Sequence, residues 1–390
     1  MLNTSEEKFD VIIVGCGFAG LYLSQLLSEK YKICVIEKNS DLVGPLRTTG
    51  STLYNKKDDI FTLFNISESL IISSYNSVTI NSQSESITTE GDDFSWVLLD
   101  IPGLKNSIKN KISPTSTILV EHEVVNIIKK EGFYDGVEVK ELKTGKKSLI
   151  RGKVIVDSTG SCVTLASKIG LKIPKYKSKC YQVDANINTT VTSSKIQMYM
   201  GFNFCPSGYA YVFPISENKV RIGTCWTPCL SDSSLVTASL FKDFLKYLKI
   251  EISNIENELD VEVFTGGINK SNSHLNLIAI GDSAGHLSPV IGEGIRFAFH
   301  SADIASTLID EYLVTNNKNI FKRFYPIWKD RFGYTFSMSY MLQFILIHIN
   351  NHFMDKFVHR LSKASARHRN LIFRIFSTKF SVYDIFKIFL

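Results

Sequence analysis

The sequence contains no CxxC pair, no cationic leader and no low-complexity linker. Its seven cysteines are scattered through 390 residues and their number is odd, so the pattern predicts neither a disulfide framework nor a tetrathiolate metal site. The start, MLNTSEEKFDVIIVG, has an acidic pair and no cationic run before its apolar stretch, which is unlike a secretory signal. We therefore expect reduced thiols, no bound metal and a cytoplasmic protein.

Most of the chain has no net charge: residues 1–354 hold equal numbers of basic and acidic side chains. The formal net charge is +6, and residues 355–390 hold eight Lys and Arg against two Asp, so the whole excess lies in this tail. The tail mixes cations with Phe, Ile and Leu at helical spacings. It predicts either a peripheral membrane contact or a helix that caps the substrate domain. No nucleic-acid partner is expected, because no binding fold for one is recognisable.

Residues 333–354 contain no Asp, Glu, Lys or Arg. Their length is near that of a membrane-spanning helix. Scattered Ser, Gln, Asn and His residues would make insertion costly, however. We expect a buried or interfacial helix.

The stretch FDVIIVGCGFAGLYLSQLLSEKYKICVIEKN joins two apolar runs through a glycine-rich turn. It predicts a strand over 11–14, a helix over 19–28 and a second strand over 33–37. This order is the opening βαβ unit of a dinucleotide-binding fold.

Gly15, Gly17 and Gly20 form the GxGxxG pattern of that unit. They permit, in order, a tight turn, the approach of a pyrophosphate and the packing of helix on strand. The helix N-terminus offers unpaired N–H groups to the phosphates. Glu37 ends the second strand, where an acidic side chain accepts hydrogen bonds from the adenosine ribose.

A second cofactor segment, GDSAGHLSPVIGEGIRFAF, covers 281–299. Gly281 ends a strand, and the Asp282 carboxylate is placed to accept from a ribityl hydroxyl. Gly292 and Gly294 leave a helix start unobstructed, and such a terminus stabilises negative charge on a reduced flavin ring. Two cofactor segments so far apart in one chain favour FAD over NAD as the dinucleotide.

Short alternating runs between these segments predict an inserted antiparallel sheet. The expected fold is α/β, with a Rossmann-like FAD-binding domain over 1–177 and 276–310. A substrate-binding sheet domain is expected over 178–275, and a helical, basic and apolar region over 311–390.

The motifs VGCGFAG, VDSTGS and GDSAGHLSPVIGEGIRFA resemble the FAD-binding segments of the flavoprotein group that contains p-hydroxybenzoate hydroxylase and the flavin halogenases. With SGYAYVFPISENKVRIG they look most like the geranylgeranyl reductase family, in order from about residue 9 to 310. The resemblance implies hydrogenation of isoprenoid double bonds by FAD, which an external donor reduces again.

The sequence departs from that family at three places. Thr49 and Gly50 stand where members commonly carry Cys-Gly, and Tyr211 stands where their sheet motif has Trp. In the segment of type Asp-Arg-x-x-Phe-Asp, Asp100 is retained and Ile101 replaces the arginine. These changes affect the reaction more than the binding of the cofactor.

Five side chains are candidates for the chemistry, each with a structural alternative. Tyr209 and Tyr211 alternate along a strand and line the substrate cavity or pack in the core. His286 is a proton donor near the ring or a local hydrogen-bonding group. Arg47 meets a flavin phosphate, a substrate headgroup or solvent. Glu293, in the first turn of a helix, is expected to be structural.

We thus expect an FAD-dependent oxidoreductase that reduces carbon–carbon double bonds of a long apolar, isoprenoid substrate. The alternatives are a flavin monooxygenase or halogenase, a redox-neutral cyclase of the lycopene type, and a flavoprotein that binds lipid without turnover. No second GxGxxG is present, so the reductant is a transiently bound NAD(P)H or a ferredoxin-like protein.

Overall fold

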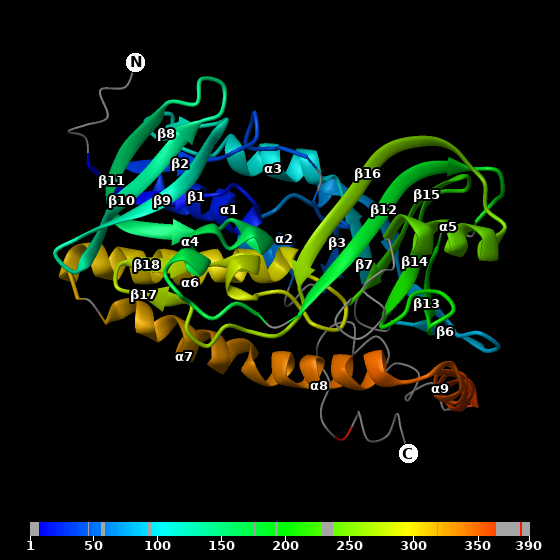
Figure 1. Cartoon of the computed structure of the whole chain (residues 1–390). Helices are drawn as coiled ribbons and strands as arrows, with labels where there is room; N and C mark the ends of the chain where they lie inside the picture. Colours follow the sequence, from blue (N-terminus) through cyan, green and yellow to red (C-terminus); the bar gives the residue numbers. More distant parts are fainter. Residues whose placement is uncertain are drawn as a thin grey trace.

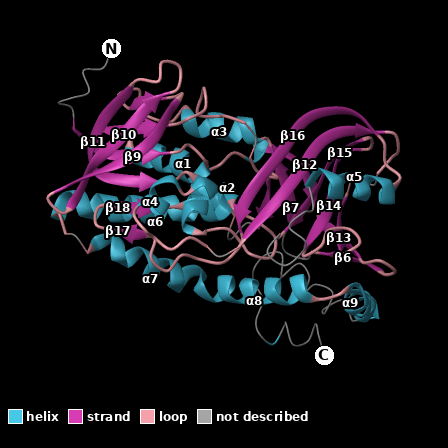
Figure 2. Cartoon of the chain, viewed as in Figure 1, coloured by secondary structure: helices cyan, strands magenta, loops and turns pink. Residues whose placement is uncertain are grey.

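The computed structural model describes residues 8–45, 47–55, 59–91, 95–174, 176–191, 194–227, 237–317, 319–363 and 383. Within these ranges the strands form sheets of eight, seven and three strands. Figures 1 and 2 place the eight-stranded sheet and its helices at one end of the molecule and the seven-stranded sheet at the other.

The eight-stranded sheet has a parallel centre in the order β18-β11-β1-β2-β8. Strands β1 and β2 lie side by side and are buried, which explains their continuous apolar runs. The antiparallel hairpin of β9 and β10 continues from β11, and β17 pairs with β18. The bounds of these strands are β1 Lys8–Val14, β2 Ile33–Ile36, β8 Thr117–Leu119, β9 His122–Lys130, β10 Phe133–Glu141, β11 Lys147–Asp157, β17 Ser273–His274 and β18 Leu277–Ala279.

Helix α1 (Phe18–Leu27) follows β1 and packs on α6 (Ile295–Thr315) and α3 (Ile101–Lys109). The first residues of α6, including Phe297 and Phe299, are fully buried. The abrupt apolar run behind the second glycine-rich segment is therefore the buried start of a long helix. Helix α4 (Thr164–Lys168) follows β11, as expected for the segment after VDSTGS.

The seven-stranded sheet runs in the order β16-β12-β15-β14-β13-β5-β6. Its outer face packs on the amphipathic helix α5 (Thr237–Leu248), which buries Leu240, Phe241 and Phe244. The bounds are β5 Ser77–Asn81, β6 Ser86–Glu90, β12 Lys177–Ile187, β13 Lys195–Met200, β14 Gly208–Ser216, β15 Lys219–Trp226 and β16 Ile252–Phe264.

The expected limit of this sheet at residue 178 is too narrow. Strands β5 and β6 come from the segment assigned to the cofactor domain, and β5 pairs with β13 in parallel. The hairpin covers the edge of β13 that would otherwise be unpaired. A three-stranded sheet lies next to it in the chain, with β3 (Ser51–Tyr54), β7 (Ser95–Leu99) and β4 (Ile71–Tyr75) in that order, and α2 (Ile60–Phe64).

The uncharged stretch 333–354 does not form one helix. Helix α8 (Tyr334–His348) ends at Ile349, whose backbone is extended, and Asn350 accepts a hydrogen bond from the Phe353 amide at the start of α9 (Asn351–Lys363). Helix α7 (Phe324–Trp328) precedes them. Among the described residues, none of the helices combines the length and the apolar character needed to span a membrane.

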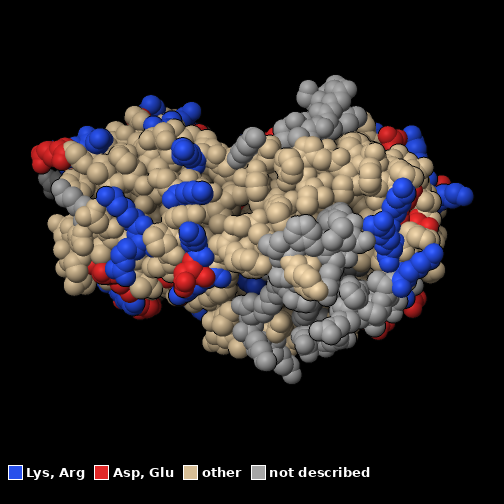
Figure 3. Space-filling model, turned by 90° about the horizontal axis from the view of Figure 1, so that it is seen from below, with Lys and Arg blue, Asp and Glu red and all other residues tan. Residues whose placement is uncertain are grey.

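The basic tail beyond residue 363, on which the peripheral membrane contact was predicted, lies outside the described residues apart from Tyr383. Seen from the side on which α8 lies, Lys and Arg side chains gather toward the two ends of the molecule (Figure 3).

Candidate cofactor and substrate site

A cavity of about 710 Å³ lies between the two large sheets. Its lining comes from the β1–α1 turn, the end of β2, the start of α3, the segment after β11, the inner face of the seven-stranded sheet and residues 280–298. This volume is typical of sites that hold a cofactor or substrate.

The glycines of the first turn have separate structural reasons. Gly15 has a φ of +92°, which side chains rarely adopt, and a Cβ at Gly20 would lie 2.1 Å from the Gly15 carbonyl oxygen. At Gly17 no described atom lies within 4 Å of the position of a Cβ. The turn and the helix packing therefore agree with the expected roles, and Gly17 leaves open space in the cavity wall.

Two long helices begin at this cavity without a described side-chain cap. Gly17 precedes α1 and Gly294 precedes α6, and both line the cavity. The free N–H groups of such helix starts attract negative charge. The cavity thus presents two positive helix ends, one from each of the segments that the sequence singles out.

Glu37 is held in place at the end of β2. Its Oε2 accepts a hydrogen bond of 2.7 Å from the Cys16 amide, and its Oε1 accepts from the backbone and side chain of Asn39. A carboxylate oxygen has the capacity to accept more than one hydrogen bond, and Oε2 accepts only one from the described residues. Glu37 lines the cavity, so a ribose hydroxyl could still donate to it.

Lys105 on α3 is a cavity residue that the sequence interpretation missed. It lies one helical turn after Ile101, and both line the cavity. Its Nζ donates to the Val43 carbonyl, and burial lowers the pKa of its ammonium group. The spacing of four residues on one helix was the signal that could have identified it.

The second glycine-rich segment supplies Gly281, Asp282, Gly292 and Gly294 to the cavity. Burial raises the pKa of the Asp282 carboxyl to about 6. The exposed loop residue Arg47 also lines the cavity. These placements are compatible with the expected roles of the segment.

The inner face of the seven-stranded sheet presents side chains in rows, because residues opposite each other on paired strands point to the same face. One row joins Tyr209, Cys225 and Cys180, and the next joins Tyr211, Gly223 and Gln182. All except Gly223 and Gln182 line the cavity.

Gly223 makes room for the ring of Tyr211. A Cβ at this glycine would lie 2.6 Å from the Tyr211 hydroxyl oxygen. The hydroxyl donates a hydrogen bond of 2.8 Å to Gln182 Oε1, and burial raises the pKa of Tyr211 well above its usual value. The phenol therefore stays protonated and fixed across the sheet.

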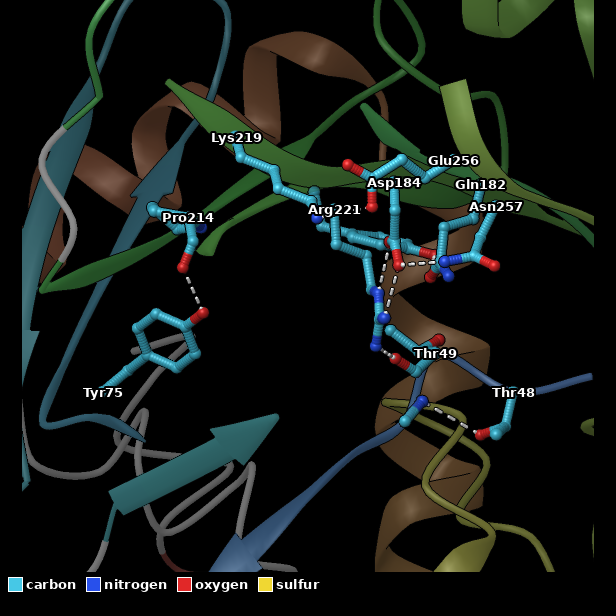
Figure 4. Close-up of polar contacts among 12 residues, drawn as sticks. Thr48, Thr49, Tyr75, Gln182, Asp184, Pro214, Lys219, Arg221, Glu256 and Asn257 are labelled. Carbon is cyan, nitrogen blue, oxygen red and sulfur yellow. Dashed lines mark hydrogen bonds and ion pairs between the residues drawn. The ribbon is translucent and has the colours of Figure 1, made fainter. Parts of the chain in front are cut away.

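The third row is a buried ion pair (Figure 4). Arg221 binds Asp184 through two hydrogen bonds of 2.6 and 2.7 Å, and Asn257 donates to the same carboxylate. The remaining guanidinium nitrogen of Arg221 donates to the Thr49 carbonyl. The sheet thus holds the turn at Thr49, which lines the cavity.

A second cavity, of about 80 Å³, adjoins the first through shared lining residues, Tyr209, Cys225 and Gly292. Its other walls are mostly apolar side chains from β13, α8 and α9, including Met198, Leu342, Leu346 and Phe357. Tyr209 therefore faces both cavities. Its hydroxyl donates to the Ile291 carbonyl at 2.9 Å, and burial raises its pKa.

His286 lies elsewhere. Its ring stacks on Trp328 at 3.8 Å between centroids, its Nδ1 is 2.8 Å from Ser301 Oγ, and it does not line the large cavity. Burial lowers its pKa to about 3, so it is neutral near pH 7. We correct its expected role as proton donor, because its side chain points into the core between helices.

Glu293 has structural contacts, in line with its expected role. It accepts a hydrogen bond of 2.8 Å from Thr52 and forms a buried ion pair with Arg296 at 3.0 Å. Cys180 and Cys225 are further cavity residues that sequence reasoning missed. The alternation of residues along β12 and along β15 could have placed each cysteine on the inner face of its own strand. It could not have shown that the two strands pair.

The residues of the large cavity fit an extended dinucleotide. Such a ligand needs open space for its pyrophosphate, which lies beside Gly17, and helix starts without a described cap, of which there are two. It also needs an acidic side chain for its ribose, and Glu37 is in the lining.

The comparisons with known proteins agree with this geometry. Residues 10–380 match the model of a family described as lycopene cyclase protein. The digeranylgeranylglycerophospholipid reductase of Methanococcus vannielii is 26% identical over 352 residues, which cover 87% of this chain and 86% of that protein. The enzyme of the same name from Methanosarcina mazei is 22% identical, with 94% and 92% covered.

Solved structures share the fold. A geranylgeranyl bacteriochlorophyll reductase-like protein from Thermoplasma acidophilum superposes with a TM-score of 0.83 at 18% identity, covering 98% of this chain and 96% of that one. The flavin-dependent brominase Bmp2 gives a TM-score of 0.71 at 15% identity, with 95% and 94% covered. At these identities the likeness concerns the fold alone.

Proposed function

The chain belongs to the lycopene cyclase protein family, and from this premise we propose that it is an FAD-dependent oxidoreductase that reduces carbon–carbon double bonds of a long apolar substrate of isoprenoid type. The names of its relatives support the reaction, since two reductases of digeranylgeranyl lipids match most of its length.

FAD is the cofactor of the large cavity in this proposal, and when bound it supplies a ring that donates hydride. The helix start at Gly17 and the ammonium group of Lys105 would hold the pyrophosphate, and Glu37 the adenosine ribose. Asp282 would accept from the ribityl chain, and the start of α6 would stabilise negative charge on the ring. Arg47 is proposed to meet a phosphate or the substrate headgroup.

The observation that carries the proposal is the junction of the two cavities. A mostly apolar cavity adjoins the large cavity, and the two share the lining residues Tyr209, Cys225 and Gly292. Its mostly apolar lining suits a short part of an alkene chain. The remainder of a long substrate would extend beyond it, past α8 and α9.

Tyr209 is the proposed proton carrier at this junction. The residue lines both cavities, and its hydroxyl holds its proton because burial raises its pKa. Tyr211, one row further, is proposed to orient the substrate beside it. A positioned acid contributes roughly 100-fold to 10,000-fold to a rate.

The test is an anaerobic reaction of the FAD-loaded protein with a lipid that bears geranylgeranyl chains, with dithionite as reductant. Each reduced bond should add two hydrogens to the product mass. Tyr209→Phe should lower turnover by about 100-fold or more at unchanged FAD affinity. Tyr181→Phe, on the outer face of the same sheet, should leave turnover unchanged. Unaltered lipid mass with bound FAD would contradict the proposal.

The family description supports a second candidate, a redox-neutral cyclisation of the same class of substrate. The same reaction distinguishes it, because a cyclised product keeps its mass and changes its chromatographic retention. An oxygen atom or a halogen in a product formed aerobically would instead indicate an oxygenase or halogenase.

We further propose that the substrate is taken from a membrane surface and that electrons come from a transient donor, NAD(P)H or a ferredoxin-like protein. Phe344 on α8 and Phe353 on α9 are 49% and 60% exposed, although both are large apolar side chains. Together with the basic tail they would form a peripheral contact with the inner face of the membrane.

A further inference from the structure

Two thiols face each other on the wall of the cofactor cavity. Cys180 on β12 and Cys225 on β15 are direct partners in an antiparallel pair and point to the same inner face. Both line the large cavity, and Cys225 also lines the apolar one. Both cysteines are free.

This placement permits a disulfide without a change of fold. Directly opposed residues of antiparallel strands have Cα atoms about 4.5 or 5.5 Å apart. A disulfide accepts Cα separations of roughly 4.4 to 6.8 Å. Only small rotations of the two side chains are then needed to bring the sulfur atoms together.

A third thiol lies nearby but is placed differently. Cys205 is buried and does not line the large cavity, and its sulfur donates to the Cys225 carbonyl oxygen at 3.3 Å. Cys205 thus supports the backbone of β15. Cys16 and Cys162 also line the large cavity, but Cys180 and Cys225 are the two thiols that lie directly opposite each other on paired strands.

We propose that Cys180 and Cys225 form a redox-active pair that closes to a disulfide and exchanges two electrons with the cofactor in the same cavity. On oxidation two S–H bonds break, one S–S bond forms, and two protons and two electrons leave. Oxidised FAD accepts both electrons and is reduced. In the reverse direction reduced FAD returns them and the thiols form again. The electron partner rests on the function proposed above, whereas the disulfide does not.

The environment of Cys180 favours the protonated thiol over the thiolate. Hydrogen bonding to Cys225 and burial raise the pKa of the Cys180 thiol. A thiol of raised pKa forms little thiolate, so its oxidation is slow near pH 7 and faster at higher pH.

The disulfide is tested on the full-length protein, with and without FAD. After prolonged treatment with diamide at alkaline pH, which supplies thiolate, and then alkylation and digestion, mass spectrometry should detect a peptide that joins Cys180 to Cys225. Cys180→Ser and Cys225→Ser should each abolish it. A disulfide that involves Cys205 instead would overturn the pairing. Full alkylation of Cys180 and Cys225 would also overturn it.

Electron exchange is tested by anaerobic dithionite titration of the oxidised FAD-loaded protein. The wild type should consume two electron pairs per flavin, and Cys180→Ser and Cys225→Ser should consume one. The matched control is Cys162→Ser, since Cys162 lines the same cavity and is exposed, and it should behave as wild type. One electron pair per flavin in all proteins would overturn the exchange.

The two proposals fail in distinguishable ways. A protein that does not bind FAD contradicts the proposed function, but the joined peptide can still be detected in it. A protein that binds FAD and reduces lipid without forming the joined peptide contradicts only the thiol pair.

Discussion

Two glycines of the first turn, Gly17 and Gly20, allow cofactor binding and folding to be tested separately. The backbone of Gly17 has φ −64° and ψ −179°, which any residue adopts, and no described atom lies near its Cβ position. A Cβ at Gly20 would lie 2.4 Å from Ser158 Oγ in addition to its contact with Gly15. The same motif therefore contains one glycine that leaves open space in the cavity wall and one that helix packing requires.

Gly17→Val should fold normally and lose FAD. We expect the melting temperature of the cofactor-free protein to stay unchanged and FAD affinity to fall by about 100-fold or more, equivalent to roughly 2.7 kcal/mol. Gly20→Ala should instead lower the free energy of unfolding by about 1 to 3 kcal/mol through overpacking. Calorimetry measures the stability of each variant, and flavin fluorescence measures its FAD affinity. Wild-type FAD affinity in Gly17→Val would exclude the turn as the pyrophosphate site.

Asp282 should make FAD binding depend on pH. Its pKa of about 6 means that the carboxylate, which accepts a hydroxyl hydrogen bond, gains population as the pH rises through 6. FAD affinity should therefore rise between pH 5 and 7 in the wild type and stay flat in Asp282→Asn. A flat wild-type profile with tight binding would place the hydroxyl groups elsewhere.

The same group affects stability without FAD. Its pKa lies above the unfolded value of about 3.9, so its stabilising contribution is complete below that pH and is lost as the pH rises through 6. The free energy of unfolding of the wild type should fall, relative to Asp282→Asn, across this interval.

At this scale the sequence pattern identified residues with a backbone function better than residues with a side-chain function. Gly15, Gly17 and Gly20 could be interpreted because their spacing implies a turn. His286 could not, since its direction depends on Trp328, which follows 42 positions later and packs on it. Lys105 was missed because the comparison of this segment with the family motif considered only Asp100 and Ile101, where the motif's arginine is absent.

Among the elements, strands β12 and β15 are joined by the ion pair of Arg221 and Asp184, which are 4% and 3% exposed. Removal of one partner of a buried pair leaves an uncompensated charge. Removal of Arg221 also removes the donor to the Thr49 carbonyl, so the turn at the cavity loses its anchor.

Arg221→Met and Asp184→Asn should each lower the free energy of unfolding by about 3 to 5 kcal/mol. The control is the ion pair of Lys219 and Glu256, also drawn in Figure 4, whose side chains are 28% and 39% exposed. Lys219→Met should change stability by less than about 1 kcal/mol. Chemical unfolding of the three variants measures this. Equal effects at both pairs would contradict the importance assigned to burial.

Elements with a strong local pattern were predicted, and elements that depend on distant partners were not. The βαβ unit, the helix at α5 and the buried start of α6 follow from apolar spacing. The recruitment of β5 by β13 joins Ser77 to Lys195, and nothing near either residue encodes that partner. The break at Ile349 was missed because a stretch without charge looks continuous.

At the scale of the whole molecule, the exposed apolar side chains of α8 and α9 predict binding to vesicles. Phe344→Ser with Phe353→Ser should weaken partition to anionic vesicles by about tenfold or more, since burial of one large apolar side chain contributes roughly 1.5 to 3 kcal/mol. Tyr247 on α5, 52% exposed, gives the control variant Tyr247→Ser, which should bind as wild type. Equal sedimentation of all three proteins would exclude this surface.

The strand order of the eight-stranded sheet has a consequence for protein synthesis. Strand β11 stays without its outer parallel neighbour until β18, which ends at Ala279, has left the ribosome. At about 5 to 20 residues per second, the segment after β18 is synthesised roughly 15 s to a minute after the β1–α1 turn. About three-quarters of the chain must therefore be translated before the two glycine-rich segments can meet, and a transcript truncated upstream of α6 yields a product that lacks part of the cavity wall.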